Sequence, residues 1–85
     1  MFAKPKSAVF IDSVVFEVDH KEPSSCLRAV LKDEQGSVMS SLEAEIPQGQ
    51  KNYRWQGLND LPYGVYVLEV KTGDNETRVR MIKRV

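Results

Sequence analysis

A turn followed by an alternating strand, at residues 61–72, constrains this chain more than any other stretch of its sequence. Leu61-Pro62-Tyr63-Gly64 combines a proline, whose ring fixes φ at about −65°, with a glycine that adopts positive φ without steric cost. Residues 65–72 then alternate and are rich in valine, which favours a strand over a helix. The charged Glu69 and Lys71 require water, so the core face is assigned to the opposite set, Tyr66, Leu68 and Val70.

The only tryptophan, Trp55, lies shortly before this turn. A large aromatic side chain in a small domain more often fills the core than presents a stacking surface to a ligand. We therefore expect Trp55 and Tyr66 to be core residues.

The length and charge of the chain limit its class. Eighty-five residues make one domain, which we divide into a flexible N-terminal arm at residues 1–7 and a single β-sandwich at residues 8–85. Twelve basic and twelve acidic residues cancel, so the composition does not indicate a nucleic-acid partner. No apolar run approaches the roughly 18 residues of a membrane-spanning helix, so we expect no membrane span.

The residues that carry chemistry are sparse. Cys26 is the single cysteine and His20 the single histidine, so no intrachain disulfide or thiolate metal cluster can form. We expect Cys26 to be a small buried hydrophobe, and we expect His20, with Asp19 and Glu22, to be solvated at the surface rather than to form a metal site. Gly-rich phosphate loops and catalytic spacings are absent, and we predict no enzyme activity, no cofactor and no metal.

The N-terminal third predicts strands. Val14, Phe16 and Val18 alternate with Val15, Glu17 and Asp19, and residues 9–11 form a separate short strand. Residues 20–25 are a polar connection. The lysines and apolar run at the start lack a signal-peptide cleavage site, and Asp12 interrupts the run. Without a signal peptide, the protein stays in the cytoplasm if the chain is complete, or else the chain is an excised piece of a longer one.

Residues 26–46 fit two structures. As a helix, Ser24 or Ser25 would cap it and Gly36 would end it. As a hairpin, Leu27, Ala29 and Leu31 would face the core, residues 33–36 would form the loop, and residues 37–45 would return. The period of the pattern alone does not decide between them.

The rest of the chain predicts further strands and turns. We expect a turn at residues 46–49, a short strand at residues 51–57, a hairpin loop at residues 73–76 and a last strand at residues 77–85. Turn signals recur every eight to twelve residues, roughly the spacing of an all-β sandwich. The predicted fold is a small immunoglobulin-like antiparallel β-sandwich of about six to seven strands.

The end of the chain is basic, because it carries Arg78, Arg80, Lys83 and Arg84 just before Val85. On a strand, the three arginines share one face. Such a face is either a solvated, charged edge that discourages aggregation or a docking surface.

From Leu27 onward the chain resembles the C-terminal sorting domain of the type IX secretion system, found on surface and secreted proteins of Bacteroidetes. It is also similar to the immunoglobulin-like domain of flagellar-hook capping proteins. The resemblance lies in an Asp-x-x-Gly hairpin, a turn leading into Gly-Val-Tyr, a Gly-containing hairpin and a basic final strand. The corresponding residues are 33–36, Leu61, Pro62, Gly64, Val65, Tyr66, 73–76 and 78–85, with Trp55 and Gly57 forming the hook-cap type Trp-x-Gly element.

The resemblance implies a β-sandwich, no catalytic residues, and recognition by secretion machinery at the cell envelope or surface. It would assign the fold to the Gly-Val-Tyr motif and protein recognition to the basic tail: Arg78, Arg80, Lys83, Arg84 and Val85. Two alternatives stay open. One is a structural module that forms a homodimer through an edge strand. The other is an α+β domain with a helix at residues 25–35 and a small-ligand pocket.

Overall fold

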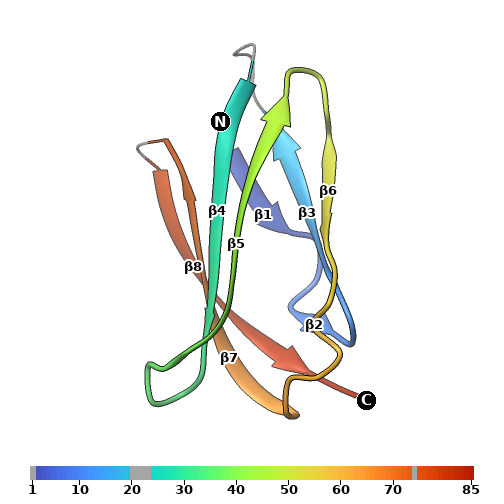
Figure 1. The fold of residues 1–85 in the computed structure, drawn as a ribbon, viewed down its shortest axis with the longest axis vertical. Helices are drawn as coiled ribbons and strands as arrows, with labels where there is room; N and C mark the ends of the chain where they lie inside the picture. The colour runs from blue at the N-terminus through green and yellow to red at the C-terminus, as the bar shows by residue number, and fades with distance from the viewer. Residues whose placement is uncertain (1, 20–23, 74) are drawn as a thin grey trace.

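The fold consists of strands in two sheets, seen in a computed structural model that describes residues 2–19, 24–73 and 75–85 (Figure 1). No helix occurs in these ranges. The strands are β1 (Phe2–Pro5), β2 (Val9–Phe10), β3 (Val14–Asp19), β4 (Ser24–Lys32), β5 (Val38–Pro47), β6 (Asn52–Trp55), β7 (Gly64–Thr72) and β8 (Asn75–Lys83).

The two sheets have the orders β1-β3-β6 and β2-β8-β7-β4-β5. Neighbouring strands are antiparallel except β2 and β8, which are parallel. The sheets lie face to face, with β4, β5, β7 and β8 on one side and β1, β3 and β6 on the other (Figure 1). The predicted all-β sandwich is confirmed. The parallel β2–β8 pair and the short β1 and β2 go beyond the predicted six to seven antiparallel strands.

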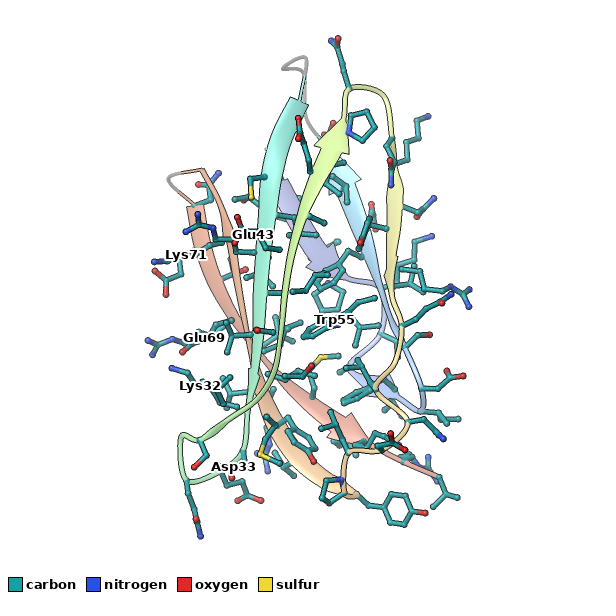
Figure 2. The ribbon with its side chains drawn as sticks, in the orientation of Figure 1. Lys32, Asp33, Glu43, Trp55, Glu69 and Lys71 are labelled. Carbon is teal, nitrogen blue, oxygen red and sulfur yellow. The ribbon has the colours of Figure 1, made fainter. Side chains whose placement is uncertain are left out.

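The core fills the space between the sheets and is built from the faces that the alternation predicted. Tyr66, Leu68 and Val70 of β7 are all buried. Next to them in the same sheet lie the buried residues Leu27, Ala29 and Leu31 of β4. Phe16 of β3 joins this core from the other sheet. Trp55 of β6 is buried and points between the sheets (Figure 2), as expected of a core residue.

A hydrogen bond at the start of β7 closes one end of the sandwich. The hydroxyl of Tyr66 donates to the carbonyl oxygen of Pro62 at 2.6 Å. A tyrosine near the start of this strand, bonded back to the backbone a few residues upstream, is the tyrosine corner of immunoglobulin-like sandwiches. The edge of the Tyr66 ring also packs on Phe10, with centroids 6.1 Å apart. The topology and this corner together make the fold immunoglobulin-like.

The reversal before β7 lies where the sequence predicts it, but its hydrogen bond is formed earlier. The amide of Leu61 donates to the carbonyl of Leu58, so the closed turn is Leu58–Leu61 and Pro62 and Tyr63 only bend the chain. Gly64 then enters β7 with φ of 144°, a backbone conformation that side chains with a Cβ rarely adopt.

The ambiguous stretch from Cys26 to Ile46 is a hairpin, so the helical alternative is wrong. β4 and β5 pair over their length, and the α+β hypothesis loses its helix. The carboxylate of Asp33 accepts hydrogen bonds from the amides of Gln35 and Ser37, both at 2.9 Å, which fixes the hairpin loop. Long-range pairing with β7 decides a choice that the local period left open.

The N-terminal residues correct another expectation. Phe2–Pro5 is not a loose arm but strand β1, paired with β3, and Ala3 is buried. Met1 lies outside the described residues. The predicted short strand at residues 9–11 is present as β2, over Val9–Phe10. Neither β1 nor β2 has a strong alternating pattern of its own. Each forms because it pairs with a longer strand, β1 with β3 and β2 with β8.

Candidate recognition surface

The outward side of the five-stranded sheet carries most of the basic residues that the sequence singled out. On β8 the outward residues are Arg78, Arg80 and Ile82, and Arg84 follows the strand in the same phase. In the β7–β8 register, Arg78 lies beside Glu69 of β7, Arg80 beside Val67, and Ile82 beside Val65. We call the exposed set Arg80, Ile82 and Arg84 the β8 face.

One end of this outward surface is neutralised. Glu69 lies between two cations, with Lys32 Nζ at 3.1 Å and Arg78 Nε at 3.2 Å from its carboxylate oxygens. Figure 2 shows Lys32 and Glu69 projecting from the sheet on the side away from Trp55. The predicted recognition residue Arg78 is therefore already paired within the protein. An exposed pair of this kind contributes little stability, but it reduces the positive charge that Arg78 presents.

The β8 face differs from this paired end. Within the described ranges, Arg80 and Arg84 form no ion pair, and both are exposed. Ile82 lies between them and is 42% exposed. It is flanked by Val9 of β2 and Val65 of β7, so an apolar strip crosses three strands. Two uncompensated guanidinium groups thus border an exposed aliphatic surface.

The position of Lys83 corrects its assignment to the recognition tail. Strand alternation turns Lys83 inward with Met81, and only 3% of it is exposed. Its ammonium donates to the carbonyl of Arg84 at 3.1 Å and lies 5.5 Å from the centre of the Tyr63 ring. Lys83 therefore ties the turn before β7 to the end of β8. Grouping it with the arginines by charge ignored the parity of the strand.

The other two tail residues are held differently. The backbone amide of Arg84 donates to the carbonyl of Phe10 at 2.9 Å, which extends the pairing with β2. Val85 is 83% exposed. The structure thus brings Arg80 and Arg84 together on one surface, separates Arg78 by its pairing, and removes Lys83 from it.

The single cysteine is also placed differently from the prediction. Cys26 is exposed, not buried, because it lies on the outward side of β4 while Leu27 faces the core. Its sulfur is 3.9 Å from a carboxylate oxygen of Glu43. The error came from applying a residue-type average in place of the strand parity already visible in Leu27, Ala29 and Leu31.

A hollow of about 300 Å³ opens at the end of the sandwich that holds the tyrosine corner. Its walls include Met39, Pro62, Tyr63 and Tyr66, with Asp33 at the rim. Burial, and to a lesser degree the charge of Asp33, raises the pKa of Tyr66 above its ordinary value. The Tyr66 hydroxyl and one Asp33 oxygen are already bonded to backbone groups, so these two polar groups serve the fold.

The described residues meet the requirements neither of a metal site nor of a membrane-spanning helix. Among the residues that the structure describes, no group of three or more His, Cys, Asp or Glu side chains could hold a metal ion. His20 and Glu22, which the sequence considered with Asp19, lie outside the described residues. The described part of the chain also contains no helix long and apolar enough to cross a membrane.

The sequence analysis missed several core residues: Ala3, Phe10, Ile46 and Leu58. Leu58 is fully buried in the loop between β6 and β7, and its amide donates to the carbonyl of Asp12 at 3.1 Å. Phe10 is buried in the short β2. A single leucine in a loop has no periodicity, so only its apolar character in a polar segment could have indicated it.

Comparison with known proteins adds no further assignment. No family model, no curated protein and no solved structure matches the chain significantly. The function must therefore be argued from the surface itself.

Proposed function

We propose that this chain is a non-enzymatic recognition module of the cell envelope, similar to a secretion sorting domain, whose β8 face binds a protein partner. The observation that carries the proposal is the pairing of Arg80 and Arg84 with the exposed Ile82. Arginine is enriched at protein interfaces in general, because its guanidinium forms bidentate hydrogen bonds with carboxylates and stacks on flat groups.

The apolar strip gives this surface an interface-like composition. Val9 and Ile82 are each 42% exposed and adjacent across the β2–β8 pairing. Docking would bury aliphatic area at the centre and leave the arginines at the rim, where charge complementarity sets specificity and the rate of association. A partner with an acidic, partly apolar surface fits this arrangement.

The same geometry argues for a role without catalysis. The Tyr66 hydroxyl and one Asp33 oxygen at the end hollow are bonded within the fold, and the sulfur of the exposed Cys26 lies 3.9 Å from a carboxylate oxygen of Glu43. Activation of a thiol requires a nearby base or cation in hydrogen-bond reach. The proposed activity is therefore binding.

The test uses charge reversal in place of truncation. Removing residues 83–85 would also remove the buried Lys83 and the Arg84–Phe10 backbone bond, so lost delivery could reflect unfolding. The double variant Arg80→Glu/Arg84→Glu leaves both intact. Fused to the end of an exported reporter in a cell that has a type IX secretion system, it should fail to deliver the reporter to the surface, whereas the wild-type module delivers it.

The matched control is Arg54→Glu, an exposed arginine on β6 of the other sheet. It should deliver the reporter as the wild type does. Delivery by the double variant at the wild-type level, or no delivery by the wild-type module, would contradict the proposal. Unfolding midpoints of all three proteins exclude a loss of fold as the cause.

A further inference from the structure

The two edges of the five-stranded sheet are very different. At one edge stands β2, with two residues. At the other stands β5, with ten residues, and no strand in the described part of the chain pairs with its outer side. Figure 1 shows β5 running along almost the full height of the molecule at this border. Every second residue of such an edge points its amide and carbonyl outward.

β5 lacks most of the devices that usually prevent edge pairing. β5 contains no lysine or arginine, and its one proline, Pro47, is its last residue. The one register irregularity of the β4–β5 pair lies near its start, opposite Leu31 and Lys32, and from Ser40 to Ile46 the pairing is regular. The only charges are Glu43 and Glu45, both on the outward side of the sheet, and Glu43 lies 3.7 Å from Arg28.

The inner side of β5 is incompletely covered. Leu42 and Ala44 pack against the core but are only half-buried, as is Tyr53 of the neighbouring sheet. A strand added beside β5 would cover these side chains while it satisfies the outward backbone groups. Both gains point to an extended segment as the occupant.

The sequence of β5 matches itself in an antiparallel arrangement. In a twofold pair centred on Leu42, Ser41 lies opposite the other copy's Glu43 and Met39 opposite its Glu45. All inward residues meet inward residues, with Leu42 against Leu42 on the axis. Centring on Glu43 or Ala44 would oppose glutamates directly, and centring on Ser41 would leave Glu45 opposite Ser37, beyond the strand.

From this complementarity we infer that β5 is a homodimer interface, in which two copies pair antiparallel about Leu42 and join their five-stranded sheets into one. The contact is one strand wide, so the dimer is weak and depends on concentration. The β8 face lies across β7 and β4 from this edge. Dimerisation therefore leaves the proposed binding surface free, and the two proposals fail or succeed separately.

A matched pair of substitutions at Ser41 tests the register. Ser41 is exposed and faces Glu43 of the other copy, so Ser41→Lys creates two opposite-charge pairs per dimer and Ser41→Glu creates two like-charge pairs. By sedimentation velocity over a concentration series, Ser41→Lys should tighten dimerisation by roughly two- to thirtyfold, and Ser41→Glu should weaken it by a similar factor. Both effects should shrink at high salt.

The controls are Asn52→Lys and Asn52→Glu, which change the net charge equally at an exposed position on β6. They should leave the dissociation constant within about twofold of wild type, since a shift below ~0.4 kcal/mol is less than twofold. Monomer alone for both the wild type and Ser41→Lys at the highest concentration would overturn the inference. So would equal association of Ser41→Lys and Ser41→Glu.

Crosslinking locates the axis independently. In a Cys26→Ser background, Leu42→Cys should form a disulfide-linked dimer on oxidation, because residues directly opposite across antiparallel strands lie about 4.5–5.5 Å apart at Cα. Ser41→Cys in the same background is the control and should crosslink at least tenfold more slowly. Preferential crosslinking of Ser41→Cys, or of neither variant, would overturn the Leu42-centred pairing.

Discussion

Strands β7 and β5 have similar lengths and the same alternating pattern, yet they play opposite parts in the five-stranded sheet. In β7 the inward residues Tyr66, Leu68 and Val70 are all buried. In β5 the inward Leu42 and Ala44 remain half-buried, and only Ile46 near the end of the strand is fully buried. The difference follows from position, because β7 has partners on both sides and β5 lies at the border. Alternation identifies the face of a strand, whereas its place in the sheet sets how deeply that face is covered.

The charges on the two strands show the same contrast. Glu69 of β7 is 18% exposed and is held by cations from β4 and β8. Glu43 of β5 is 66% exposed and has one longer contact, to Arg28. Central strands thus collect partners from both neighbours, and edge strands leave their groups available to another chain. Two measurements compare the strands directly, and a third tests the start of β7.

The largest effect is expected from truncating one leucine in each strand. Leu68→Ala should lower the free energy of unfolding by about 3 kcal/mol, because it opens a cavity at a fully buried site. Leu42→Ala should cost about 1 kcal/mol, since its site is half-open and can be filled by water or by shifts of its neighbours. Urea unfolding at concentrations where the protein is monomeric measures both values. Equal losses would show that β5 is as well covered as β7.

A middle-sized effect is expected at the tyrosine corner. Tyr66→Phe removes the 2.6 Å bond to Pro62 and should cost about 1 kcal/mol. Burial raises the pKa of Tyr66, so the folded state favours the protonated phenol. The stability that Tyr66 contributes through this shift is fully present at pH values below its ordinary pKa of 10.0. It is lost as the pH rises through the higher pKa of the folded state.

The difference in stability between wild type and Tyr66→Phe should therefore diminish above about pH 10. Tyr63→Phe is the control, because that ring is 65% exposed and the corner hydrogen bond is made by the Tyr66 hydroxyl. It should change stability by less than about 0.5 kcal/mol. If Tyr66→Phe were as stable as wild type at neutral pH, the hydrogen bond from Tyr66 to Pro62 would not stabilise the fold.

The smallest effect separates the two glutamates. Glu69→Gln should cost about 0.5–1 kcal/mol, because it leaves Lys32 and Arg78 without their shared carboxylate. Glu43→Gln should change stability by less than about 0.3 kcal/mol, since its pair is solvent-exposed. Thermal unfolding at low and high salt measures both, and the Glu69 effect should decrease with salt. A larger loss at Glu43 would reverse the ranking of central and edge strands.

The surface was predicted less completely than the core. The arginines at positions 78, 80 and 84 were correctly placed on one side by alternation, but the ion-pair partner of Arg78, Glu69, comes from β7 and could not be read from the tail. Lys83 was grouped with them by charge, although its phase with Met81 indicates an inward side chain. The exposed Ile82 becomes part of an apolar strip only because Val9 and Val65 lie beside it on the neighbouring strands, which the sequence does not show.

What the sequence determined by itself is the class of the fold and the inward faces of its longer strands, because alternation and turn chemistry act over a few residues. Tyr66, Leu68 and Val70 were placed in the core on those grounds alone, and Trp55 on its size and aromatic character. Only the tertiary structure decided that residues 26–46 form a hairpin, that Phe2–Pro5 is a strand, and that Leu58 is buried. Each of these depends on contacts between segments distant in the chain, whose energies no local pattern contains.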